Sequence, residues 1–189
     1  MDVLPFEAVA DQRSPATARP FTIGRLSRDD PAKHHAEDPA LYRMLASRGL
    51  RVRIMGGSCL AASLAGVDGI ELLPAGAESA AEFCASLDAF FYRTGAFSEA
   101  YGRVVAEAMA SGLPVVVHSR GGYAEIIEDG VSGFLIRSQE EAYDALLRLA
   151  ADPALCRTVG DAARQRAHQA HGPEATHRDM AYYLRAGAG

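Results

Sequence analysis

The chain alternates between short apolar runs and longer segments in which apolar residues recur at the spacing of one helix face. Runs of this length are typical of buried strands, and the longer segments are typical of amphipathic helices. The predicted strands span residues 21–24, 51–55, 69–73, 89–92, 114–118 and 133–136. The predicted helices span residues 38–45, 79–87, 102–111, 140–151, 153–169 and 174–184.

Helix start and stop signals support several of these boundaries. Pro39 falls in the first turn of the helix that Asp38 opens, and Gly49 follows the end of that helix. Strands that alternate with helices form a parallel sheet with right-handed crossovers. We therefore predict an α/β fold, a Rossmann-like three-layer α/β/α arrangement around a mostly parallel sheet of about six strands.

Residues 1–20 differ from the rest because they carry three prolines and no periodic pattern. We interpret this segment as a linker or hinge. Residues 21–189 are long enough for one domain with its own hydrophobic core, and we predict that they form a single unit.

Charge and composition exclude several classes of protein. The net charge of −5 disfavours a nucleic-acid-binding surface, which needs a basic field. No apolar run is long enough to span a membrane, and no signal-peptide pattern opens the chain. The three cysteines, Cys59, Cys84 and Cys156, are widely spaced and form no metal or redox motif, so we predict buried thiols and a cytoplasmic protein.

The start of the helix 102–111 is a candidate anion site. Gly102 lets the backbone approach a ligand closely, and the first helical amides, such as that of Arg103, have no partner within the helix. Glu99 precedes this helix start, and Glu107 lies one to two turns inside the helix. Carboxylates can accept hydrogen bonds from vicinal hydroxyls. Two acids beside an anion site therefore suit a ligand that carries a phosphate between two sugars.

The same residues form an extended pattern. Glu99 and Glu107 are spaced as Glu-x7-Glu, with Tyr101-Gly102 between them. Further pieces occur in order, namely Ile23-Gly24-Arg25-Leu26, Gly121-Gly122-x-x-Glu125 and Asp129-Gly130-Val131-x-Gly133. Together they resemble the family 4 retaining glycosyltransferases of the GT-B fold over residues 21–137.

The resemblance implies a nucleotide diphosphate sugar as donor, transfer with retention, no cofactor and no metal on the diphosphate. It implies catalytic roles for Glu99 on the transferred sugar and for Arg25 and Lys33 on the diphosphate. It places the ribose on Glu107. The remaining donor-binding residues that we expect are Tyr101, Gly102, Arg103, Gly24, Gly56, Leu73, Gly121 and Gly122.

Three features depart from the family pattern. Lys33 follows Arg25 by eight positions where the family has about five, and His34 or Arg28 are alternatives for its role. Arg93 and the residue after it stand where the family often has Pro-Ser. Arg93 is either a variant contact to the donor or a surface residue. We also expect that the N-terminal acceptor domain is absent, that it is supplied in cis or by a partner chain, and that the isolated chain is inactive.

Other readings of the sequence predict different functions. The chain could be a degenerate GT-B domain that serves as a binding or assembly module, or a domain similar to nucleotide-sugar epimerases, although the Glu-x7-Glu spacing favours a transferase. The sequence lacks the dinucleotide motif GxGxxG, GxSxG and the P-loop. We expect His168, His171 and His177 to be solvated helix residues, and we predict no metal site.

Overall fold

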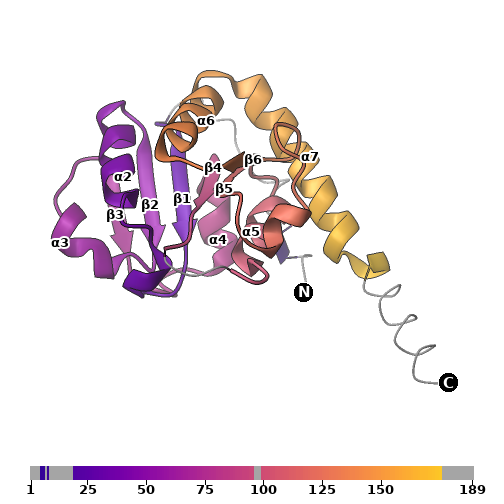
Figure 1. The fold of residues 1–189 in the computed structure, drawn as a ribbon, viewed down its shortest axis with the longest axis horizontal. Helices are drawn as coiled ribbons and strands as arrows, with labels where there is room; N and C mark the ends of the chain where they lie inside the picture. Colours follow the sequence, from indigo (N-terminus) through magenta and orange to yellow (C-terminus); the bar gives the residue numbers. More distant parts are fainter. Residues whose placement is uncertain (1–4, 7, 9–18, 96–98, 176–189) are drawn as a thin grey trace.

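The structure is a computed structural model, and it describes residues 5, 6, 8, 19–95 and 99–175. Within these residues a single sheet is formed by β1 (Thr22–Leu26), β2 (Arg51–Met55), β3 (Ile70–Leu73), β4 (Ala89–Tyr92), β5 (Val115–His118) and β6 (Phe134–Ile136). The strand order is β3-β2-β1-β4-β5-β6, and every neighbouring pair is parallel (Figure 1). The predicted α/β fold with a parallel six-stranded sheet is confirmed.

Helices follow the strands along the described chain. The α-helices are α2 (Asp38–Ser47), α3 (Ala61–Leu64), α4 (Ala80–Ala85), α5 (Arg103–Ala110), α6 (Gln139–Ala151) and α7 (Pro153–His171). Short 3-10 turns are η1 (Pro31–Lys33), η2 (Ser58–Leu60) and η3 (Gly122–Glu125). The sequence pattern predicted all of these α-helices except α3 and none of the 3-10 turns. The predicted helix 174–184 and the linker 1–20 lie mostly outside the described residues.

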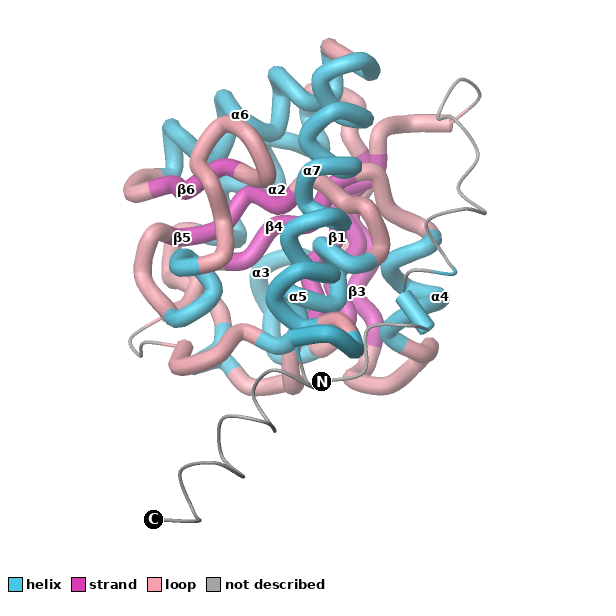
Figure 2. Tube along the Cα trace, turned by 90° about the vertical axis from the view of Figure 1, so that its right-hand side faces the viewer, coloured by secondary structure: helices cyan, strands magenta, loops and turns pink. Residues whose placement is uncertain are grey.

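Alternating side chains of the strands build a separate core on each face of the sheet, because successive residues of a strand point to opposite sides. In β4, Phe90 and Tyr92 pack in the cluster that includes α4, α5 and α7. Ala89 and Phe91 pack in the cluster that includes α2, α3 and α6. Figure 2 shows the strands between these helical layers.

Local sequence explains where several helices begin. Ser79 and Glu82 form a reciprocal capping box at α4, and the Ser138 side chain accepts the Glu141 amide at α6. Asp152 caps α7, whose first residue is Pro153. These caps satisfy amides that have no partner within the helix.

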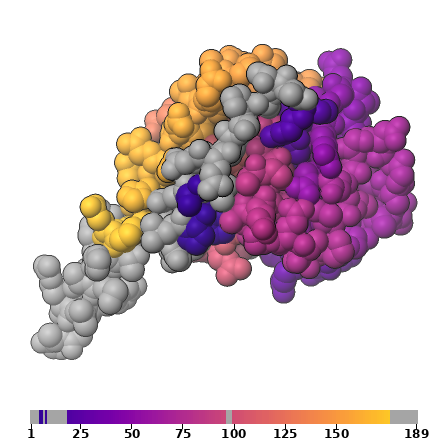
Figure 3. All heavy atoms as spheres, turned by 180° about the vertical axis from the view of Figure 1, so that it is seen from behind, coloured from indigo at the N-terminus to yellow at the C-terminus, as the bar shows by residue number. Residues whose placement is uncertain are grey.

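The described residues near the N-terminus lie against the body of the domain, where they are seen in indigo from behind (Figure 3). Phe6 is buried and packs in the cluster formed with α4, α5 and α7. Its neighbours in the sequence lie largely outside the described residues, so the structure leaves the linker prediction untested.

The strand order reverses between β1 and β4. The strands β2 and β3 follow outward on the side of β1, and β5 and β6 follow outward on the side of β4. In sheets of this kind, ligands bind in the crevice at the carboxyl ends of the strands beside this reversal. Leu26 and Tyr92 end the two strands here. The loops after β1 and β4 therefore form the first place to look for a site.

Candidate functional site

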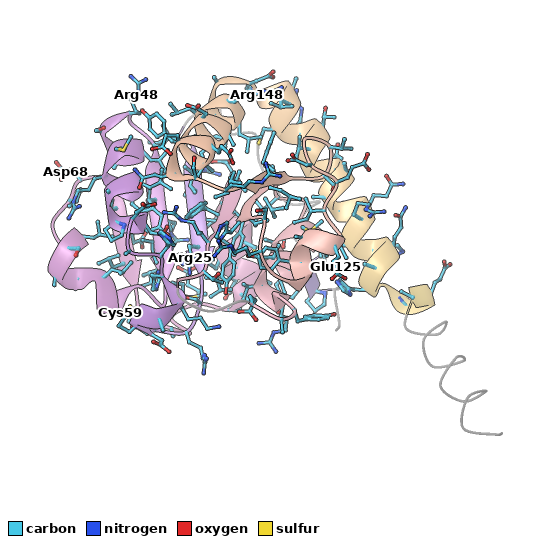
Figure 4. The ribbon with its side chains drawn as sticks, viewed as in Figure 1. Arg25, Arg48, Cys59, Asp68, Glu125 and Arg148 are labelled. Carbon is cyan, nitrogen blue, oxygen red and sulfur yellow. The ribbon has the colours of Figure 1, made fainter. Side chains whose placement is uncertain are left out.

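Arg25 lies beneath this crevice as a fully buried side chain, only 1% exposed (Figure 4). It belongs to β1, where it pairs with Ile54 of β2. Its guanidinium donates hydrogen bonds to the backbone carbonyl of Arg93, at 3.0 Å, and to that of Lys33. It also lies 4.7 Å from the centre of the Tyr92 ring. Arg25 thus joins the end of β4 to the loop that carries Lys33.

Lys33 and Tyr92 converge on the carboxylate of Glu99. The Lys33 ammonium lies 3.0 Å from Glu99 Oε2, and the Tyr92 hydroxyl donates to the same oxygen at 3.1 Å. Burial raises the pKa of Glu99, but hydrogen bonds from Lys33 and Tyr92 leave that pKa below the ordinary glutamate value. Burial raises the pKa of Tyr92 to about 12, so its hydroxyl is a donor at neutral pH.

A helix begins beside Glu99, where the sequence predicted one. Gly102 precedes α5 with φ 70° and ψ 47°, a left-handed conformation that favours glycine. The backbone amide of Gly102 also lowers the pKa of Glu99, which places this carboxylate close to the helix start. An ionised carboxylate is therefore held beside the amides of α5.

Glu107 lies inside α5 and is almost buried. Its carboxylate is 3.4 Å from Arg103 Nε, one helical turn earlier. Burial raises the pKa of Glu107, and the charge of Arg103 offsets this only in part. Glu107 is the fifth residue of α5, whereas Glu99 precedes the helix.

Gly121 and Gly122 pack directly on the loop that carries Glu99. The Gly122 amide donates to the Glu99 backbone carbonyl at 3.0 Å. A Cβ on Gly121 would lie 2.8 Å from that same carbonyl oxygen, and one on Gly122 would lie 2.1 Å from the Ala100 oxygen. Larger residues would therefore displace the Glu99 loop.

Tyr101 differs from its neighbours because its side chain is 52% exposed. Its hydroxyl lies 3.2 Å from His171 Nδ1, and the centres of the two rings are 5.6 Å apart. This contact connects the Glu99 loop to the end of α7.

The remaining predicted donor-binding residues lie within β1 or at the carboxyl ends of β2 and β3. Gly24 is inside β1, where a Cβ would collide with Leu87. Gly56 follows β2, and its amide donates at 2.9 Å to the carbonyl of Leu73, the last residue of β3. The Gly56 carbonyl lies 3.1 Å from His34 Nε2.

Arg93 is buried, so the alternative that it is a surface residue is wrong. Its side chain forms ion pairs with Asp38 at 2.9 Å and with Glu37 at 3.1 Å. Sequence reasoning also missed Tyr92 as a partner of Glu99. The only sequence signal for this contact was a tyrosine at the end of an apolar strand. That signal did not indicate which way the Tyr92 hydroxyl points.

The histidines that the structure describes belong to no candidate metal site. His168 and His171 lie on α7, whereas His177 falls outside the described residues. Across the part of the chain that the structure describes, no group of three or more His, Cys, Asp and Glu side chains could hold a metal ion. No helix among these residues is both long and apolar enough to cross a bilayer.

Comparisons with known proteins place the described geometry in context. The family profile described as "Glycosyl transferases group 1" matches residues 40–166, which is more than half of the chain. Sucrose synthase 2 of Pisum sativum is 42% identical over 80 residues, which cover 39% of this chain and 10% of that protein. A D-inositol 3-phosphate glycosyltransferase of Streptomyces griseus subsp. griseus is 46% identical over 69 residues, which cover 35% of this chain and 15% of the relative.

A solved structure has the same fold over almost the whole chain. The crystal structure of Anabaena HepE in complex with UDP and glucose superimposes with a TM-score of 0.75 at 20% identity. The match covers 98% of this chain and 53% of HepE. The chain therefore spans about half the length of this structure and a smaller part of the curated relatives that it matches.

Proposed function

The chain belongs to the group 1 family of glycosyl transferases, and from that membership we propose that it binds the nucleotide diphosphate sugar donor of a retaining glycosyltransferase. The matched range 40–166 contains both Glu99 and Glu107. The observation that carries the proposal is the convergence of Lys33 and Tyr92 on Glu99 beside the start of α5. This cluster combines an anion-binding helix start with a carboxylate suited to sugar hydroxyls.

Each residue of the site has a defined role in this proposal. Glu99 contacts the transferred sugar, and Glu107 accepts hydrogen bonds from the ribose hydroxyls. Lys33 and the first amides of α5 bind the diphosphate. Arg25 adds positive charge from beneath and, through the Lys33 carbonyl, holds the loop that carries the ammonium.

The chemistry that these residues supply is mainly electrostatic. Negative charge develops on the diphosphate as the bond to the sugar breaks, and fixed cations and amides stabilise that charge. We propose that Lys33, Arg25 and α5 supply this stabilisation in place of a metal ion. Lys33 already contacts Glu99, so a bound diphosphate would pair with the same ammonium group, which the contact with Glu99 holds in place.

The acceptor side of the enzyme is proposed to lie elsewhere. The chain covers 53% of HepE, and attack geometry needs the second wall of the cleft. A further domain, in cis or on a partner chain, would supply it. We also assign the protein to the cytoplasm, in line with its three widely spaced cysteines.

Calorimetric titration of the chain with UDP, GDP and ADP tests the proposal. Each titration is run with and without magnesium, and we expect one nucleotide to bind without the metal. HepE, whose structure contains UDP, makes UDP the first choice.

The variant Glu107→Ala should weaken that binding by about 1–3 kcal/mol, the contribution of a charged hydrogen bond. Glu125→Ala is the matched control, because Glu125 is exposed and lies beside α7, away from Arg25 (Figure 4). Equal affinities of the two variants would reject the ribose role of Glu107. If no nucleotide binds to the unaltered chain, the alternative of a degenerate binding module replaces the donor domain.

A further inference from the structure

Tyr92 closes a ring of contacts beneath the candidate site. The guanidinium carbon of Arg25 lies 4.7 Å from the centre of the Tyr92 ring, and the Tyr92 hydroxyl donates to Glu99 Oε2 at 3.1 Å. The same oxygen lies 3.0 Å from Lys33 Nζ, and the backbone carbonyl of Lys33 accepts a hydrogen bond from Arg25. Tyr92 therefore connects the buried cation to the carboxylate that faces the ligand.

Tyr92 holds Glu99 from the buried side. Its ring is buried, stacks on Phe90 with 6.4 Å between the ring centres, and meets Tyr123 edge-on at 5.9 Å. The side chain of Glu99, by contrast, is 22% exposed. A ligand can therefore approach the carboxylate from solvent, while the hydroxyl of Tyr92 reaches it from the core.

The Tyr92 hydroxyl differs from the Lys33 ammonium in charge. Burial raises the pKa of Tyr92 to about 12, so this hydroxyl is a neutral donor at neutral pH. A diphosphate attracts the cationic ammonium by a Coulomb energy that a neutral hydroxyl lacks. When a diphosphate pairs with Lys33, the hydrogen bond from Tyr92 therefore remains on Glu99.

A bound diphosphate also brings negative charge towards Glu99. A like charge nearby favours the protonated form of a carboxyl group, and a protonated carboxyl group has fewer sites that accept hydrogen bonds. A hydrogen bond donated to the ionised carboxylate opposes that change. The Tyr92 hydroxyl is thus the group that keeps Glu99 ionised and in one orientation while the diphosphate occupies Lys33.

We propose that Tyr92 is a positioning residue that orients the Glu99 carboxylate for the hydroxyls of the transferred sugar, so that its own hydroxyl governs the sugar part of donor affinity and not the nucleotide part. The proposal rests on the donor-binding function proposed above. The contacts with Arg25 and Tyr123 fix the ring, and the hydroxyl then points at one oxygen of Glu99.

Tyr92→Phe tests the proposal because it removes the hydroxyl and keeps the ring that contacts Arg25 and Phe90. Tyr123→Phe is the matched control. Tyr123 is buried in the same cluster, but its hydroxyl has no hydrogen-bond partner among the described residues. Thermal melts of both variants establish that they remain folded.

The first measurement follows the ionisation of Glu99 with no nucleotide present. The signal of its carboxyl carbon is recorded by NMR as a function of pH, and Glu99→Gln identifies that signal. Tyr92→Phe should raise the pKa of Glu99, because a hydrogen bond that lowers this pKa is lost. Tyr123→Phe should leave the pKa of Glu99 unchanged.

The second measurement compares UDP, GDP and ADP with their glucose conjugates by calorimetry. We expect one glucose conjugate to bind the unaltered chain more tightly than its nucleotide does. Tyr92→Phe should reduce this gain by about three- to tenfold, the net effect of one hydrogen bond, and should leave the affinity of the bare nucleotide unchanged. Tyr123→Phe should alter neither quantity.

Four results would overturn the inference: an unchanged pKa of Glu99 in Tyr92→Phe, no gain from glucose in the unaltered chain, an equal gain in the two variants, or weaker binding of the bare nucleotide to Tyr92→Phe. In each case, a nucleotide that binds the unaltered chain leaves the donor-domain proposal standing. If no nucleotide binds the unaltered chain, the donor function and this role of Tyr92 are rejected together.

Discussion

Replacing Gly102 with alanine tests whether the Glu99 loop depends on one backbone conformation. Gly102 has φ 70°, and a left-handed conformation costs an L residue about 1–2 kcal/mol. A Cβ here would also lie 2.3 Å from Tyr123 Cδ1. Tyr123 is 1% exposed, so its ring has little room to move, and overpacking of this kind costs about 1–3 kcal/mol. The two costs together predict a loss of about 2–5 kcal/mol in the free energy of unfolding.

Gly49→Ala is a matched control because it separates the two costs. Gly49 has φ 82°, but a Cβ there would meet nothing within 4 Å. It should therefore lose only the conformational part, about 1–2 kcal/mol. Urea unfolding followed by circular dichroism measures both variants, since the chain has no tryptophan. Losses that agree within about 0.5 kcal/mol would refute the packing argument for Gly102.

Two further predictions concern charged groups. Arg93→Ala should lower the free energy of unfolding by about 3–5 kcal/mol, because the carboxylate of Asp38 would be left buried without its cationic partner. The half-exposed pair of Arg51 with Glu71 is the control, and Arg51→Ala should lower the free energy of unfolding by at most about 1 kcal/mol. If urea unfolding shows similar losses for Arg93→Ala and Arg51→Ala, the burial argument is wrong. The lowered pKa of Glu99 predicts stability that is present above the ordinary glutamate pKa and is lost as the pH falls through the lowered value. Lys33→Met should move this loss to higher pH, and an unchanged pH profile of the urea midpoint would reject the pairing.

The fold could be predicted because its signals are local. Strand-length apolar runs, Pro39 in the first turn of α2 and Gly102 before α5 each mark a boundary without reference to distant residues. Alternation of strands and helices then permits few arrangements besides a parallel sheet. The helix α3 was missed because its four residues are too short to show a periodic pattern.

The contacts within the site could not be predicted, because they join residues far apart in the sequence. Lys33 and Glu99 are 66 positions apart, and their contact depends on the shape of the loop after β1. The sequence analysis identified both as candidate site residues, but it gave no reason to expect a contact between them. Arg93 illustrates the same limit, since an arginine directly after a strand is more often exposed. Its burial depends on Asp38, which the sequence marks only as a helix start.

Glu107 links the stability of the domain to its proposed role. Its pKa is raised, so the ionised form is less favourable in the folded chain than in the unfolded chain. At pH values above the raised pKa this carboxylate therefore opposes folding, and protonation at lower pH removes that cost. Arg103, 3.4 Å away and largely exposed, offsets only part of it. A buried carboxylate of this kind accepts ligand hydroxyls without first giving up a full hydration shell, which favours the ribose contact that we propose for Glu107.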